Sequence, residues 1–415
     1  MAISTHHDIG HEPAGQLNIT SIARPALVAG VILLGITGAK LFGSDSHDMM
    51  ASYLFGLMFW MSITLGMFGL SILHHTVRGT WSVPLIRLFE AGGGWINLIV
   101  MAALFTPILI NLPALYDWAT PAKVAVDSVM THRAAYMNPG AFIFRFVFFF
   151  VVWCSYAWGM RNSVLRQEKN RDFKLELGRT SWGAAGMPMF FLTVTFALTD
   201  WVMSLDNHWS STMYGTWYII CGCGAALGFC LMIFNSNVDK EPYRSVTSPT
   251  LGKDMGNMQF VFTMLWAYTS LSQFLILWNG NIPETASYYK ERSSSMFPAG
   301  MEGNHWGIIG MVLVIGRFFI PFFLLITPRI KRIPANLKMV GGWIFCLQIA
   351  EIYLFTQPSI PGRAVQGPFA AHLIWDAVAF FAIGAIWLSV FAFQVAKAPL
   401  IPTYDDRLEA MKNAH

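Results

Sequence analysis

The sequence has few charged residues. Asp, Glu, Lys and Arg make up 12% of its 415 residues, whereas soluble globular domains carry roughly 25%. This shortage excludes an ordinary soluble protein. The uncharged stretches are long and apolar, and many reach the ~20 residues that a helix needs to cross a bilayer. Because these runs are continuous rather than alternating, the sequence predicts an all-α integral membrane protein and not a membrane β-barrel.

Cysteine is also scarce, and none is placed as a metal ligand. The five cysteines all lie in apolar segments, outside any Cys-x-x-Cys-His haem motif or four-cysteine iron–sulfur spacing. Histidine offers no haem site either, because the adjacent His74 and His75 point in different directions from one helix. We therefore expect this chain to hold no metal, no haem and no iron–sulfur cluster.

The beginning of the chain lacks the pattern of a signal peptide. Residues 1–23 are polar and rich in histidine, without a basic start that leads into a short apolar stretch. We expect 1–24 to be an N-terminal segment and the first spanning helix to stay in the membrane.

About ten apolar stretches are long enough to span a membrane. Together they predict one polytopic domain over 25–393, followed by a C-terminal tail at 394–415. Polar or turn-forming segments join the stretches, which we expect to be mostly unbroken helices. The stretches are 25–43, 49–73, 86–111, 141–160, 182–203, 212–235, 256–278, 304–327, 339–357 and 371–393.

Lys and Arg are distributed unequally between alternate loops. Most of the 27 Lys and Arg residues lie on the side that holds both termini, and the segment 161–179 contains the largest group of them. Because cytoplasmic loops are enriched in these residues, both termini are predicted to face the cytoplasm. The opposite, outer side has Lys40, Lys123, Arg133, Lys290, Arg292 and Arg363, and Arg145 and Arg317 lie within spans.

Several ionisable residues are predicted to lie at a similar depth in the membrane, near the outer ends of the spans. At membrane depth such a group costs at least ~2.5–3.5 kcal/mol, so it needs a partner, a cavity or a role. We expect these residues to form one polar pocket. They are Arg145 and Asp200 inside the fourth and fifth spans, His372 and Asp376 at the start of the tenth, and Asp206, His208 and His305 just outside.

Three further charges lie deeper or on the cytoplasmic side. Arg317 and Glu351 each fall ~15–20 Å from the cytoplasmic end of their spans, which would let them pair near the midplane. Glu90 lies one turn inside the third span. A purely structural explanation remains open for each residue. Arg317 and Glu351 would then form only an ion pair between helices, and Glu90 would be an acid that stabilises a helix N-terminus.

The outer residues have the chemistry that a quinone site requires. A quinol loses two protons as it gives up two electrons, so its pocket needs a carboxylate or imidazole to accept a proton, within aromatic walls. The expected quinone contacts are Asp200, Trp201, His208, Trp209 and Tyr214. The candidates for proton transfer are Asp200, Asp206, His208, Glu90, Arg145, Arg317, Glu351 and Asp376.

Three segments resemble the NrfD/polysulfide-reductase-like family of quinone-binding membrane subunits. They are FALTDWVMSLDNHWSSTMYGTWY (196–218), RLFEAGGGWINLI (87–99) and SYLFGLMFWMSITLGMFGLSILHH (52–75). The string Asp-Trp-x-Met-Ser-Leu-x-x-His-Trp is the most specific, and the similarity covers nearly the whole chain. Within the family, the sequence is most similar to the F subunits of alternative complex III, a quinol:cytochrome c oxidoreductase.

The resemblance implies an arrangement of the spans and a location. Family members have two four-helix bundles plus peripheral helices, which places bundle one at roughly 49–203 and bundle two at roughly 212–357, with peripheral helices at 25–43 and 371–393. The expected location is the bacterial cytoplasmic (inner) membrane.

The resemblance also implies a function and partners. Asp200, Asp206 and His208 match the most specific string, and Glu90 matches the second segment; the other candidates rest on depth alone. An F-type subunit is expected to carry a proton route coupled to quinol oxidation, beside a quinone or menaquinone. Its expected partners are an iron–sulfur/molybdopterin-like subunit, a second NrfD-like subunit, haem c subunits and membrane lipid, without nucleic acid.

Two other functions remain open. A proton-coupled secondary transporter would bind its substrate at the midplane between repeats, with broken helices. A purely structural anchor for extrinsic redox subunits would need no polar pocket. Purification separates these alternatives, because a transporter is isolated alone and a respiratory subunit with its redox partners.

Overall fold

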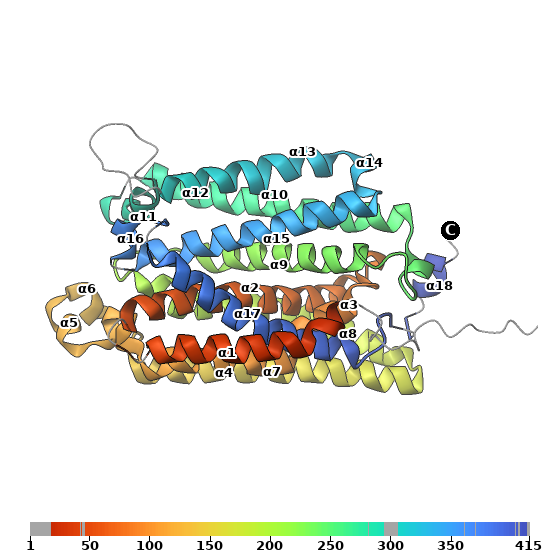
Figure 1. Cartoon of the computed structure of the whole chain (residues 1–415), viewed down its shortest axis with the longest axis horizontal. Helices are drawn as coiled ribbons and strands as arrows, with labels where there is room; N and C mark the ends of the chain where they lie inside the picture. The colour runs from red at the N-terminus through yellow and green to blue at the C-terminus, as the bar shows by residue number, and fades with distance from the viewer. Residues whose placement is uncertain are drawn as a thin grey trace, which may run out of the picture.

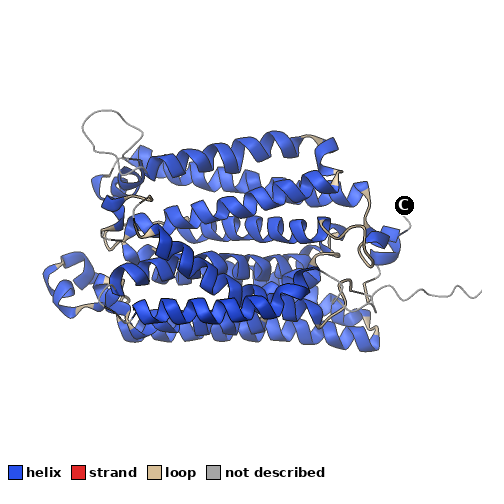
Figure 2. Ribbon diagram, viewed as in Figure 1, coloured by secondary structure: helices blue, strands red, loops and turns tan. Residues whose placement is uncertain are grey.

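The computed structural model describes residues 18–412 except 42, 44–45, 281, 294–305, 361, 370, 403 and 406. Every regular element in this part of the chain is a helix (Figure 2). Ten helical segments are long and apolar enough to cross a membrane. The prediction of an all-α, multi-pass membrane protein is therefore confirmed. Of the candidate residues, His305 lies outside the described part, as does most of the N-terminal segment.

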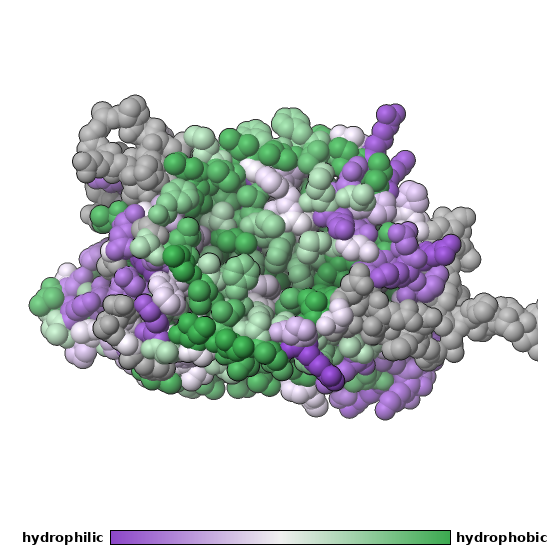
Figure 3. All heavy atoms as spheres, viewed as in Figure 1, coloured by the Kyte–Doolittle hydropathy of each residue, from purple (hydrophilic) through white to green (hydrophobic). Residues whose placement is uncertain are grey.

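The spanning helices lie side by side along the long axis of the molecule (Figure 1). Apolar side chains cover the middle of the visible face, and hydrophilic ones gather toward its two ends (Figure 3). We call the end that holds residues 161–179 and 407–412 the basic end. The other end, which holds residues 121–133 and 363–366, is the opposite end. The charge distribution predicts the basic end to be cytoplasmic.

The bounds of the spans extend several of the predicted stretches. The spans are α1 (Ala23–Leu41), α2 (Ser46–Val77), α3 with α4 (Ile86–Gly93 and Trp95–Ile110), α7 (Pro139–Asn170), α8 (Phe173–Trp201), α9 (Tyr214–Asn235), α10 (Pro249–Gly280), α12 to α13 (Trp306–Leu313 and Ile320–Ile326), α15 (Pro334–Thr356) and α17 (Leu373–Ala396). Short helices join them: α5 (Pro121–Val126), α6 (Ser128–Arg133), α11 (Pro283–Ser293), α14 (Pro328–Lys331), α16 (Arg363–Gln366) and α18 (Arg407–Lys412).

The contacts between helices divide the spans into two groups and an outer pair. In bundle one, α2 packs against α3, α4 and α8, and α7 packs against α4 and α8. In bundle two, α9 packs against α10 and α15, α10 against α13, and α12 against α15. The bundles meet where α2 packs on α9, and both helices are buried along almost their whole length. The outer pair α1 and α17 packs against α2.

Glycines allow the central helices to approach closely. A Cβ atom on Gly66 of α2 would lie 2.3 Å from the carbonyl oxygen of Gly222 in α9. A Cβ on Gly228 of α9 would lie 2.5 Å from the carbonyl oxygen of Gly341 in α15. Such contacts between backbones are typical of helix packing in membranes, where small residues let dispersion forces act at short range. They fix the rotation of α2, α9 and α15, and with it the direction of their polar side chains.

Two spans are interrupted, although the sequence predicted mostly unbroken helices. The third span breaks at Gly94, whose backbone is extended between α3 and α4. A Cβ atom there would lie 2.3 Å from the carbonyl oxygen of Glu90, so the break requires glycine. The eighth span contains a π-helical segment, Val314–Phe319, that includes Arg317. π-Helical turns are rare and frequently lie at functional sites.

The basic segment 161–179 is helical rather than a loop. α7 continues to Asn170 and α8 begins at Phe173. Arg, Leu, Gln, Glu and Lys are good helix formers, so the two helices continue beyond the apolar core into water. Arg171, in the left-handed region with φ 53°, ends α7, and the Asp172 side chain caps α8 by accepting from the Lys174 N–H.

Candidate functional site

Asp200 and Arg145 form a closed ion pair between α8 and α7. The Arg145 Nε and Nη2 donate to the two carboxylate oxygens over 2.7 and 3.0 Å. Asp200 is 1% exposed, and the guanidinium lies 3.7 Å from the ring centre of Tyr136. Burial, together with the charge of Asp200, raises the pKa of the Tyr136 phenol to about 12. Arg145 thus satisfies both oxygens of this carboxylate, as the depth of the two residues predicts.

The five expected quinone contacts do not surround a common space. Trp201 is fully buried among the aromatic side chains of bundle one, away from Trp209, which stacks on Tyr288 at 4.2 Å. Tyr214 is packed against both of those rings and donates to a backbone carbonyl. His208 is exposed, with its Nε2 3.0 Å from a carboxylate oxygen of Asp127.

The cavity next to these residues is small. It measures about 30 Å³ and is lined by Asp206 and Trp209, but not by Trp201, His208 or Tyr214. Such a volume has room for a few water molecules rather than for a quinone ring. The Asp206 carboxylate accepts from the backbone N–H of His208 over 3.0 Å, which fixes the loop after α8.

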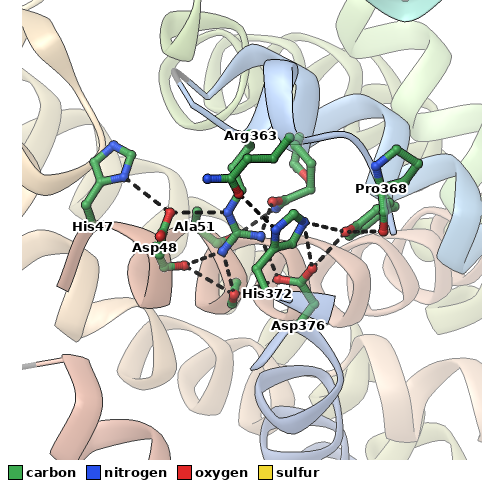
Figure 4. Close-up of polar contacts among 12 residues, drawn as sticks. His47, Asp48, Ala51, Arg363, Pro368, His372 and Asp376 are labelled. Atoms are coloured by element: carbon green, nitrogen blue, oxygen red, sulfur yellow. Dashed lines mark hydrogen bonds and ion pairs between the residues drawn. The ribbon is translucent and has the colours of Figure 1, made fainter. Parts of the chain in front are cut away.

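Asp376 belongs to a second, separate network at the opposite end (Figure 4). Its carboxylate accepts from Ser52 over 2.6 Å, Tyr353 over 2.7 Å and Arg363 over 3.0 Å, and lies 3.7 Å from the His372 Nε2. These side chains come from α2, α15, α16 and the start of α17. The expectation of one pocket shared with Asp200 is wrong, because α2 packs between α8 and α17 and separates the two groups.

His372 connects this network to an open cavity. The cavity has a volume of about 420 Å³ and is lined by Lys40, Arg363, His372 and Trp375, among others. Burial and the positive charge of Arg363 lower the pKa of the His372 imidazole, and the Asp376 carboxylate only partly opposes this. His372 is therefore a neutral group between a buried carboxylate and the cavity.

Arg317 and Glu351 meet inside bundle two, as their depths predict, but the pair is open. The Arg317 Nη1 lies 3.8 Å from the Glu351 Oε2, and both side chains are at most 3% exposed. The other terminal nitrogen, Nη2, donates to the carbonyl of Cys221 over 3.0 Å. Neither Nη1 nor Oε2 makes a hydrogen bond with a described residue. The carboxylate faces Trp217, Cys221 and Trp266.

A stripe of polar side chains on α10 faces the same interior. Its spacing of three and four residues places it on one side of the helix, and its side chains are buried apart from the partly exposed Ser270. At ~1.5 Å per residue it extends over about 20 Å of a ~30 Å hydrocarbon core. We call it the α10 stripe: Gln259, Thr263, Trp266, Ser270 and Gln273.

Bundle two contains several buried polar atoms that make no hydrogen bond with a described residue. Proteins pair nearly all such atoms with protein groups or ordered water. Ordered water is the usual partner of buried polar atoms that find none in the protein. In the described part of bundle two these atoms are Nε1 of Trp217 and Trp266, Oη of Tyr243, Oε1 of Gln259 and Gln348, Oγ of Ser270, Nη1 of Arg317 and Oε2 of Glu351.

Glu90 lies in a cluster of charges at the basic end of bundle one. Its Oε2 accepts from Arg87 over 2.6 Å and from Arg161 over 2.7 Å, and Arg87 also pairs with Glu168. Glu90 is the fifth residue of α3, so the interpretation as an acid at a helix N-terminus is wrong. The neighbouring His75 is buried, and its Nε2 has no hydrogen bond among the described residues.

Sequence reasoning missed several members of these networks, three glutamines and one arginine. Gln259 and Gln273 lie on α10, Gln348 lies one turn before Glu351, and Arg363 was expected only as a loop residue. The spacing of the α10 stripe was a signal available in the sequence. The role of Arg363 was not, because it depends on how α16 folds back over α2.

The comparisons with known proteins leave the family open. No protein-family model matches the chain, and no curated protein matches it. Within the described residues, no group of three His, Cys, Asp or Glu side chains is arranged to hold a metal ion. The fold and the site therefore define the class of this protein, which is a multi-pass membrane protein with buried charges in two bundles.

Proposed function

We propose that bundle two carries protons across the membrane and that Glu351 is the group that accepts and releases them. One observation supports this most: the Glu351 Oε2 lies at membrane depth, faces Trp266 of the α10 stripe and makes no hydrogen bond with a described residue. An ionisable residue in a span is functional by default unless its charge is fully paired. Arg317 lies close enough to stabilise the carboxylate but does not bind it as Arg145 binds Asp200.

The route would run along the α10 stripe. Gln259 donates to the carbonyl of Gly224 over 3.2 Å on the side of the basic end, and Gln273 accepts from Ser211 over 2.5 Å on the other. Water between these side chains would pass protons to and from Glu351. The π-helical segment holds Arg317 at the centre of the route.

We further propose that this proton route belongs to a subunit of a respiratory quinol:cytochrome c oxidoreductase of the alternative complex III type. The support is the sequence resemblance to NrfD-like subunits. The partners would be an iron–sulfur/molybdopterin-like subunit, a second NrfD-like subunit and haem c subunits. Isolation from the native membrane with those cofactors attached is the expected result, and isolation of the chain alone would reject this assignment.

The proposed subunit would also hold a quinone at the outer end of bundle one. The ring would be placed near Asp200, where the cavity lined by Asp206 and Trp209 has room only for a few water molecules. A photoreactive quinone analogue tests it directly. Labelling of the loop 202–213 supports a quinone in this chain, and labelling confined to other subunits leaves this chain with the proton route alone.

Exchanging Glu351 for Gln tests the proton route. Gln keeps the size of the side chain but cannot carry a proton, so proton translocation should fall about tenfold or more, while quinol-dependent cytochrome c reduction falls less. The matched control is Gln348→Glu, which adds a carboxyl group one turn away and should not replace Glu351 in a Glu351→Gln background. An equal loss of both activities, or no loss, would reject the route.

A proton-coupled transporter is the second candidate, and the two interrupted spans favour it. Broken helices that place charges beside a break are typical of transporter binding sites. Here Glu90 precedes the break at Gly94, and Arg317 lies in the π-helical segment. Substrate-dependent proton uptake by the purified chain, without redox partners, would establish this alternative.

A further inference from the structure

A cavity opens at the basic end of bundle one, outside the proposed proton route. It has a volume of about 100 Å³ and lies between the break in the third span, α7 and the end of α17. Apolar and aromatic side chains form one part of its wall. They include Phe68, Trp95, Tyr156 and Met160.

The rest of the wall is polar and carries excess positive charge. Arg87, Arg161 and Lys397 line the cavity, against a single carboxylate, Glu90. Glu90 is already bound by both arginines. Lys397 is exposed and forms no ion pair with a described residue. Three positive charges therefore line the cavity against one negative charge. Arg87 is also bound by Glu168, outside the lining, and Lys397 is available to a ligand.

The break in the third span adds hydrogen-bond donors to this wall. α4 is sixteen residues long and begins at Trp95, and its N-cap residue Gly94 supplies no capping side chain. The first N–H groups of a helix are unpaired and favour an anion. Gly94, Trp95 and Asn97 all line the cavity.

Two buried polar atoms of the lining residues independently lack a partner. Arg87 is 3% exposed and its Nε makes no hydrogen bond with a described residue. Asn97 is fully buried, its Nδ2 donates to the Ala91 carbonyl, and its Oδ1 accepts from no residue that the structure describes. A ligand with both an anionic group and a hydroxyl or amine would satisfy a donor and an acceptor here.

The position along the spans indicates where such a ligand comes from. Arg161 directly follows the apolar stretch 141–160 of α7, and Lys397 directly follows α17. Both cations therefore lie at the level of the lipid head groups. Trp95 is also typical of this level. Basic pockets between spans on the cytoplasmic side bind anionic phospholipids.

We propose that this cavity binds the phosphate head group of an anionic phospholipid. The phosphate lies between Arg161, Lys397 and the N-terminus of α4, and the polar end of the head group donates to Asn97. The acyl chains follow the apolar surface of α4 and α7, where Ile99 and Trp158 are exposed.

Native mass spectrometry of the full chain in mild detergent tests the proposal. Phosphatidylglycerol is titrated in and compared with phosphatidylcholine and with inorganic phosphate. The wild-type protein should retain one phosphatidylglycerol per chain in preference to phosphatidylcholine. The double variant Arg161→Gln/Lys397→Gln should bind it at least roughly tenfold more weakly, since each cation near the surface contributes.

Two further variants keep the test decisive. Lys338→Gln removes one exposed positive charge at the basic end of bundle two and should leave binding unchanged. If the double variant does not fold, Lys397→Gln alone, at an exposed position, should still weaken binding severalfold. Equal retention by all variants would overturn the proposal. Displacement of the lipid by millimolar inorganic phosphate would also overturn it, in favour of a site for a soluble anion.

Discussion

Arg145 binds both oxygens of Asp200, at 2.7 and 3.0 Å, whereas Arg317 approaches Glu351 only to 3.8 Å, and Oε2 makes no hydrogen bond within the part of the chain that the structure describes. Each pair joins the third helix of a bundle to its fourth, so the two arrangements are comparable. The first is closed and holds two helices together. The second is open, and its carboxylate remains available to a proton.

The closed pair should contribute to stability. Asp200→Asn leaves the Arg145 charge unpaired, and breaking a buried pair costs about 3 kcal/mol or more. The melting temperature in detergent should fall clearly. The double variant Arg145→Met/Asp200→Leu should recover most of this loss, because an apolar pair of similar size replaces a buried ion pair at little cost. A single variant as stable as the wild type would show that the pair is not a structural link.

The α10 stripe should be required for proton translocation along its whole length. Gln259→Leu and Gln273→Leu each remove a buried polar group from one end of the stripe and should reduce translocation severalfold. Leu is apolar and cannot bind the water that a relay needs. The control Leu265→Gln changes an exposed position of the same helix that lies outside the stripe. Equal effects of all three substitutions in a reconstituted proton assay would contradict this prediction.

His372 should make the opposite end sensitive to acid. Its pKa in the folded protein lies below the usual value of about 6.5 because of burial and Arg363. The unfolded chain therefore binds more protons than the folded one as the pH falls below ~6.5, so stability is lost on acidification until the folded pKa is passed. Thermal unfolding between pH 7.5 and pH 5, read by circular dichroism, measures this.

The His372→Gln variant should lose part of that pH dependence. The charged groups that face His372 are Arg363, Asp376 and Asp48, and all three remain in the variant. His132→Gln is the control, since His132 is exposed at the same end. If the two variants follow the same pH curve as the wild type, His372 does not control this transition.

The close packing of α2 on α9 should not tolerate a methyl group. Gly66→Ala places a Cβ 2.3 Å from the Gly222 carbonyl oxygen, so one backbone must move. Overpacking of this kind costs about 1–3 kcal/mol. Gly35→Ala in α1 is the matched control, because a Cβ there meets nothing within 4 Å, and it should be neutral or slightly stabilising. The difference in melting temperature between the two variants is the measurement.

The sequence by itself determined the class of protein, the ten spans and the two charge pairs. Hydropathy and charge are properties of local stretches, and a helical rise of ~1.5 Å per residue converts them into depth. Depth is what places Arg145 beside Asp200 and Arg317 beside Glu351.

Only the tertiary structure decided which residues share a face. Asp200 and Asp376 lie near the same end, yet α2 separates them. The rotation of each helix depends on contacts between backbones, such as Gly66 with Gly222, that join distant parts of the chain. The breaks at Gly94 and in Val314–Phe319 likewise arise from packing rather than from hydropathy. For this reason depth could be calculated along the chain, while the direction of each polar side chain could not.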